Sequence, residues 1–152
     1  MKISVQQEDF DLGREVLDIR QDNRIGAVAS FVGQVRDVAM TLEHYPGMTE
    51  NAIKKIVEEA RSRWKILDFT VIHRYGDLRP NDQIVLVAVA SSHRADAFAA
   101  CQFIMDYLKT GAPFWKKEHH PEGARWVDAR ESDDEAADRW RKLKQASRLL
   151  KP

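Results

Sequence analysis

The stretch ILDFTVIHRYGDLRPNDQIVLVAVAS, residues 66–91, decides the fold of this chain. Its two apolar segments, residues 66–75 and 83–91, have the length and the β-branched composition of strands. Between them, GDLRPND (76–82) is made of residue types that form turns. Because this connection is too short for a crossover helix, we predict that the two strands pair antiparallel.

Helical and extended patterns alternate on both sides of this hairpin. The further elements that we predict are helices at 9–21, 48–64, 93–109 and 132–150 and strands at 25–36, 41–45 and 125–128. Gly111 is expected just past the end of the third helix. Helices combined with one clear antiparallel hairpin predict the α+β class.

The composition is that of one globular domain over residues 1–152, with 43% hydrophobic residues. Lys plus Arg and Asp plus Glu both total 24, a balance that argues against nucleic-acid binding. The sequence has one cysteine, and its start lacks the apolar core of a signal peptide. Its longest apolar run, 84–90, is too short to cross a bilayer. We therefore expect a cytosolic protein that does not associate with membranes.

The densest group of reactive side chains lies in the second half of the chain. Lys109 ends a predicted helix, and Lys116, Lys117 and Glu118 follow the rigid segment 112–115. Lysine attacks as the neutral amine, which neighbouring cations and partial burial favour. Such a cluster can bind an anionic substrate and activate one of its own lysines. The alternative is a solvated patch that complements the helix dipole, and spacing alone leaves both open.

Other basic residues stand where apolar elements begin or end. His93 and Arg94 open a predicted helix, where backbone N–H groups and the Arg fork can bind phosphate. Arg36 ends a predicted strand in which Gly33 indicates a bulge or a close backbone approach. For each of these cations, a solvated surface position is the alternative.

Several other kinds of site are disfavoured by the sequence. The histidines and the one cysteine lack zinc-type spacing, and no phosphate-loop, dinucleotide or G-x-S-x-G pattern is present. Cys101 shares a helical stripe with Phe98, Ile104 and Met105, so we expect a core residue and not a reactive thiol.

A family resemblance rests on five segments in a fixed order. They are GAVASFVGQVRD (26–37), LEHYPGMTE (42–50), VIHRYGDLRPND (71–82), SSHRADAFAACQFIMDYLKTGAPFWKKE (91–118) and RWVDARES (125–132). With them the chain, from about Ile25 to Trp140, resembles the large, catalytic subunit of molybdopterin synthase.

This resemblance implies an α/β hammerhead fold, with an antiparallel sheet flanked by helices, and a homodimer within a heterotetramer. Each protomer would bind a small ubiquitin-like sulfur-carrier subunit whose C-terminal Gly-Gly is a thiocarboxylate. Sulfur would pass in two rounds to cyclic pyranopterin monophosphate and form the molybdopterin dithiolene. The reaction would require no metal and no cofactor.

The resemblance also implies a set of site residues. Lys109 and Lys116 match catalytic positions of the family, with Lys109 as our candidate for the covalent or proton-transfer role, although the two roles could be exchanged. The substrate-binding positions matched are Gln34, Val35, Arg36, His93, Arg94, Lys109, Lys116, Lys117, Glu118 and Arg130. Phe31 and Met105 match positions that line the pocket, and Arg130 is expected to reach the pocket of the neighbouring protomer.

Two points remain open at the level of sequence. A non-catalytic module that binds a phosphorylated ligand or an acidic tail would use the same basic pocket, although a pair of lysines favours the enzyme. The family has a longer polar loop after the Val-Arg segment, whereas only residues 37–41 separate Arg36 from Leu42 here. A wide gap in the backbone at this place would indicate omitted residues.

Overall fold

The computed structural model describes residues 1–127 and 131–150. Their helices are α1 (Leu12–Ile19), α2 (Met48–Arg63), α3 (Arg94–Gly111) and α4 (Glu131–Leu150). Their strands are β1 (Lys2–Gln6), β2 (Ala27–Gln34), β3 (Met40–His44), β4 (Asp68–Arg74), β5 (Gly76–Leu78), β6 (Gln83–Ser91), β7 (Phe114–His120) and β8 (Gly123–Val127). These elements confirm the α+β class.

The first sheet has the strand order β1-β4-β6-β2. The antiparallel pairing of β4 with β6 is confirmed, with Asp68 opposite Ala90 and His73 opposite Val85. β2 pairs antiparallel with the other side of β6. β1, which the sequence pattern did not reveal, runs parallel to β4, so this sheet is mixed.

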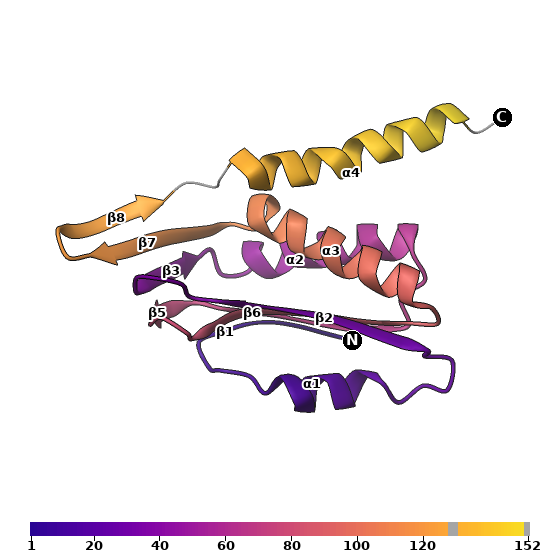
Figure 1. Cartoon of the computed structure of the whole chain (residues 1–152), viewed down its shortest axis with the longest axis horizontal. Coiled ribbons are helices and arrows are strands. Elements are labelled where there is room, and N and C mark those ends of the chain that lie inside the picture. Colours follow the sequence, from indigo (N-terminus) through magenta and orange to yellow (C-terminus); the bar gives the residue numbers. More distant parts are fainter. Residues whose placement is uncertain (128–130, 151–152) are drawn as a thin grey trace.

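Helices cover both faces of the first sheet (Figure 1). In β6, Val85, Val87 and Val89 join the main core with α2 and α3, whereas Leu86 and Ala88 join a second core under α1. Successive side chains of a strand point to opposite faces. Because both faces of β6 are buried, its sequence is apolar throughout.

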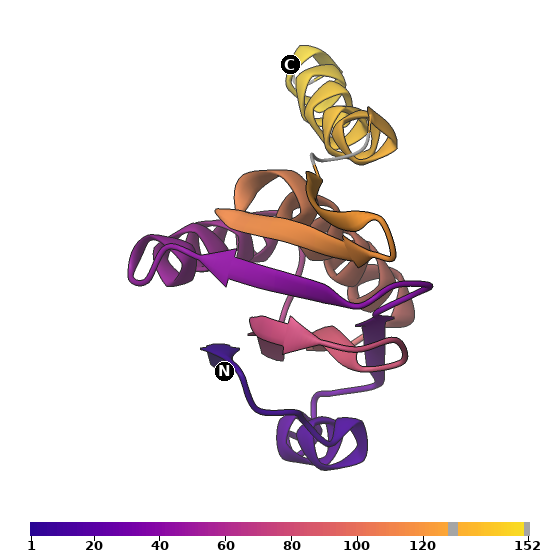
Figure 2. The ribbon, with the colours of Figure 1, turned by 90° about the vertical axis from the view of Figure 1, so that its left-hand side faces the viewer.

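The second sheet has the order β5-β3-β7-β8 and draws its strands from distant parts of the chain (Figure 2). β7 was not predicted from the sequence, and the residues of β5 were predicted to belong to a turn. Met40 and Leu42 of β3 pack with Val35 and Leu78 in a third core, which attaches this sheet to the first.

The C-terminal helix α4 packs on α3 on the side away from the first sheet (Figure 1). Trp140 donates its indole N–H to Asp106 at 2.8 Å, and its ring contacts those of Trp64 and Phe103 edge-on. Gly111 belongs to α3, so the prediction that it lies past the helix end is wrong by one residue. In the described part of the chain, no helix has the length and apolarity needed to cross a membrane.

The short connection between β2 and β3 is closed by a tight turn. Asp37 has a φ of 70°, and the Val38 N–H donates to the Arg36 carbonyl at 2.9 Å. An aspartate tolerates this left-handed conformation better than most residues do. The five residues between Gln34 and Met40 are thus sufficient to link the two sheets.

Candidate active site

The two candidate lysines lie on consecutive elements. Lys109 is in the last turn of α3 and is exposed, whereas Lys116 is half-buried in β7. Only residues 112–113 lie between these elements, and the Phe114 N–H closes the connection by donating to the Ala112 carbonyl at 2.9 Å. The end of α3 and the start of β7 therefore form one short, constrained corner.

The side chains of β7 alternate between two faces of the second sheet. We call inner the face that carries Phe114, Lys116 and Glu118, because Phe114 packs against the main core. On the opposite, outer face, the Lys117 ammonium lies 5.4 Å from the centre of the Trp126 ring, a cation–π contact. The run 116–118 is therefore divided, and Lys116 shares its face with Glu118 but not with Lys117.

A buried histidine that was not among the predicted site residues lies beneath this corner. The His73 ring stacks on the Phe114 ring with centroids 3.7 Å apart and planes 17° apart. Its Nδ1 lies 2.9 Å from the Arg74 carbonyl, which only accepts, so Nδ1 carries the proton. The pKa of His73 is lowered to about 4, mainly by burial and also by the charges of Lys109 and His44, against the raising effect of the bond to the Arg74 carbonyl. His73 is thus neutral at physiological pH.

The strand-end segment 34–36 lies next to β3. Val35 is buried with Met40 and Leu42, the residues opposite Glu118 and Lys116 in the second sheet. Arg36 is exposed, with its Nε 3.7 Å from the Asp37 carboxylate. This segment and the inner face of β7 therefore border the same strand.

Gly33 explains how the chain turns into this segment. The register of β2 against β6 shifts between Gly33 and Gln34, and a Cβ on Gly33 would lie 2.8 Å from Cγ1 of Val85. The predicted bulge is confirmed, whereas the atom that comes close to Gly33 belongs to a side chain and not to the backbone. The Val35 N–H then donates to the Asp82 carbonyl at 2.9 Å, which fixes the segment on the turn before β6.

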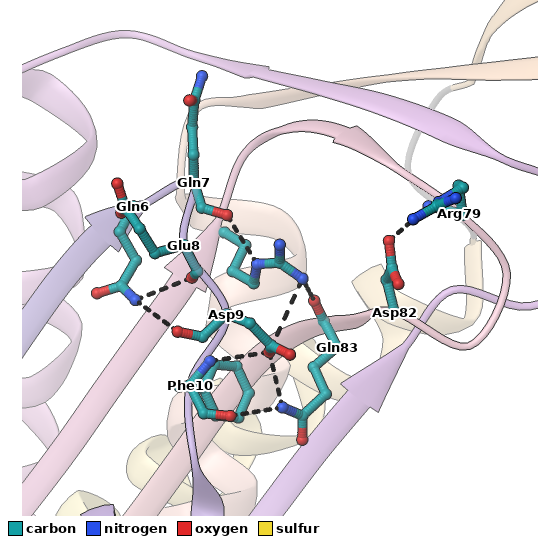
Figure 3. A network of polar contacts seen from close by, with 9 residues as sticks. Gln6, Gln7, Glu8, Asp9, Phe10, Arg79, Asp82 and Gln83 are labelled. Carbon is teal, nitrogen blue, oxygen red and sulfur yellow. Dashed lines mark hydrogen bonds and ion pairs between the residues drawn. The ribbon is translucent and has the colours of Figure 1, made fainter.

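A polar network that includes Arg74, the residue after His73, holds the same end of the first sheet (Figure 3). The Arg74 guanidinium donates to the carbonyls of Gln7 and Gln83 at 2.9 and 2.8 Å. The Gln83 amide donates to the Asp9 carboxylate at 2.8 Å, and this bond is the main cause that holds the pKa of Asp9 below its usual value. These bonds tie together three segments, so the backbone around His73 has little freedom.

His93 and Arg94 lie at the other end of α3. Both are exposed, and the His93 side chain makes no cap bond to the helix. At 1.5 Å per residue, the axial separation of Arg94 and Lys109 is about 22 Å. A single chain therefore does not bring this pair to the lysines.

The remaining predicted residues have different surroundings. Met105 is 9% exposed and belongs to the main core, and Phe31 is 42% exposed on β2. Because Ala29 of the same strand joins the core with α3, Phe31 lies on the face of β2 that α3 covers. Arg130 lies outside the described residues.

The structure also bears on metal binding and on the reactivity of Cys101. Within residues 1–127 and the described part of α4, no three His, Cys, Asp or Glu side chains lie close enough to hold a metal ion. Cys101 is 6% exposed, and burial raises the pKa of its thiol to about 11. The prediction of a core cysteine is thus confirmed.

Comparisons with known proteins place this chain in a family. The model of the MoaE protein family matches residues 5–111. The molybdopterin synthase catalytic subunit of Ralstonia nicotianae is 61% identical over 146 residues, which cover 91% of this chain and 83% of that protein. A Burkholderia ambifaria MC40-6 structure, a molybdopterin biosynthesis MoaE protein, is 60% identical with a TM-score of 0.81, over 92% of this chain and 98% of that one.

A more distant structure shares the fold. It is a chain of the complex of subunits 1 and 2 of molybdopterin-converting factor from Helicobacter pylori 26695. It is 21% identical with a TM-score of 0.66, over 85% of this chain and 90% of that one. From the family match and the close relatives, we conclude that the chain belongs to the MoaE family.

Proposed function

We propose that this chain is the catalytic subunit of a molybdopterin synthase of the cytosol. It transfers sulfur from the thiocarboxylated C-terminus of a small ubiquitin-like subunit to cyclic pyranopterin monophosphate, forming the dithiolene of molybdopterin. The carrying observation is the short corner between α3 and β7, in which Lys109 precedes Phe114 along the chain and Lys116 follows it. The close relatives named as catalytic subunits support the same activity.

The two lysines suit different tasks in this proposal. Lys109 is exposed at a helix end and takes the covalent or proton-transfer role, because it can reach an incoming tail without moving the core. Lys116 is half-buried beside Glu118 and holds an anionic group of the substrate or tail. Arg36, at the end of the neighbouring segment, adds a second cation for the phosphate.

The small-subunit partner and the homodimer also belong to the proposal. The Helicobacter pylori chain of the same fold occurs in a complex of two subunits, which supports a small partner here. The length of α3 supports the homodimer, because His93 and Arg94 can serve a lysine site only if a second copy brings them there. In this arrangement each site uses the lysines of one protomer and the His-Arg pair of its partner.

The activity is tested by mixing the purified chain with the thiocarboxylated small subunit and cyclic pyranopterin monophosphate, and by measuring dithiolene formation. Lys109→Ala should lose most turnover, about 100-fold or more, because a catalytic proton or covalent step is removed. Lys54→Ala is the matched control, since Lys54 is an exposed lysine on α2. Binding of the small subunit without any product would favour the non-catalytic module.

Mixed dimers test the sharing of residues between protomers. Lys109→Ala and Arg94→Ala proteins are each assayed alone, then unfolded together, refolded and assayed again. If a site combines Lys109 of one copy with Arg94 of the other, about a quarter of all sites regain both residues. A mixture no more active than its two components would contradict this arrangement.

A further inference from the structure

We propose that His73 is a positioning residue, whose buried ring sets the place of β7 against the end of α3 and thereby the spacing of Lys116 and Lys109. This inference rests on the proposed function, because it assigns a role within the same reaction.

The first sheet fixes the position of His73. Its backbone pairs with Val5 of β1 on one side and with Val85 of β6 on the other. Its side chain is on the same face as Val71, which belongs to the main core with α2 and α3. His73 thus points toward the helices, at the end of the strand where the second sheet begins.

The ring orientation is also fixed. The Nδ1–H group donates to the Arg74 carbonyl at 2.9 Å, so rotation of the ring would break a bond at a largely buried position. Arg74 itself is held by the carbonyls of Gln7 and Gln83. The face of the imidazole is therefore presented to Phe114 in one orientation.

A second histidine ring also lies near Phe114. His44, its partner in the second sheet, has its ring centre 6.2 Å from that of Phe114. The Thr49 hydroxyl gives its proton to the Tyr45 carbonyl at 2.8 Å, so the His44 Nδ1, 3.3 Å away, is the donor to Thr49. Phe114 therefore has two neighbouring rings, one on β4 and one that is bonded to the start of α2.

Both lysines are close to Phe114 along the chain. Lys116 follows it by two residues, about 6.6 Å in an extended strand, and Lys109 precedes it across the short connection 112–113. The positive charge of Lys109 is also one of the causes that lower the pKa of His73. Loss of the His73–Phe114 contact would therefore let Lys116 move relative to Lys109, and a misplacement of about 1 Å can reduce a rate by about 100-fold.

The test compares two replacements of similar size in the full chain. His73→Phe keeps an aromatic ring for Phe114, whereas His73→Leu fills the site without one, and both lose the bond to the Arg74 carbonyl. We expect His73→Leu to lower kcat by about 10- to 100-fold with KM for the small subunit within about twofold. His73→Phe should stay within about threefold of the parent kcat, although both variants lose similar thermal stability.

A second measurement does not depend on turnover. The rate of acetylation of each lysine is followed by mass spectrometry on the folded proteins. Lys116 should react at least about threefold faster in His73→Leu than in the parent or in His73→Phe, because β7 has lost its contact, whereas Lys54 should be unchanged.

The outcomes separate the two ideas. Parent protein that makes no dithiolene would refute the proposed function, and the labelling rates would still decide the role of His73. Equal kcat and equal Lys116 labelling in the Leu and Phe variants would overturn the positioning role. A recovery of kcat in the double variant His73→Leu/Phe114→Leu would also overturn the positioning role. The stacking of residue 73 on Phe114 would then not be required for activity.

Discussion

Acidification should destabilise this protein well above the pH at which its carboxylates titrate, and His73 is the reason. The pKa of His73 is lowered from 6.5 to about 4 in the folded state, first by burial and then by the charges of Lys109 and His44. In the unfolded chain the imidazole binds a proton near pH 6.5. The contribution of neutral His73 to the free energy of unfolding is therefore fully present above pH 6.5. It is lost as the pH falls from 6.5 toward 4.

The expected size follows from the two pKa values. The full difference between the unfolded and folded pKa values of His73 corresponds to about 3 kcal/mol in the free energy of unfolding. About 2 kcal/mol of this amount is lost between pH 7 and pH 5. Asp9 and Asp22 do not account for this window, because their pKa values are lowered from 3.8, that of Asp22 to about 2, so their contributions are lost at lower pH.

Urea unfolding followed by tryptophan fluorescence at pH 7, 6 and 5, at one protein concentration, measures this loss. His73→Phe cannot titrate at this position. This variant should be less stable than the parent at pH 7. Between pH 7 and pH 5, however, its free energy of unfolding should fall by about 2 kcal/mol less than that of the parent. Parallel pH curves for the parent and the variant would refute the reasoning.

Two further predictions concern packing. Gly33→Ala should cost about 1–3 kcal/mol, because the new Cβ would lie 2.8 Å from Cγ1 of Val85. Urea unfolding of the double variant Gly33→Ala/Val85→Ala should show less destabilisation than the sum of the two single changes, and strict additivity would contradict the clash. Cys101 should react with an aromatic disulfide reagent at pH 8 at least about 100-fold more slowly in the folded protein than in guanidinium, since its thiol is buried and its pKa is raised to about 11. Equal rates in the two conditions would show an accessible thiol.

The sequence predicted elements that carry their own pattern. The antiparallel β4–β6 pair was predictable from two apolar runs and a turn, and α2 from its spacing of apolar residues. β7, with the sequence FWKKEHH, was not, because most of its residues are polar and its strand conformation depends on pairing with β3 and β8.

The same distinction applies to the candidate site. Lys109 and Lys116 were predictable because their chemistry is visible in the residue types. His73 was not, since a histidine at the end of an apolar strand has no local signal that separates a positioning role from simple burial. The distance between Arg94 and Lys109 follows from the helix rise alone, and it excludes their convergence within one chain once both are assigned to α3.

The two consecutive lysines of β7 keep a cation on the inner face even if the later part of the strand is shifted by one residue. If Trp115 were deleted while Phe114 kept its place, every later side chain would exchange faces. Lys117 would then occupy the inner position that Lys116 holds now, so a cation would remain there. Glu118 would move outward, and the cation would lose its acidic neighbour. The two consecutive lysines therefore keep a positive charge on the inner face of β7 after such a shift. They do not keep the carboxylate of Glu118 next to that charge.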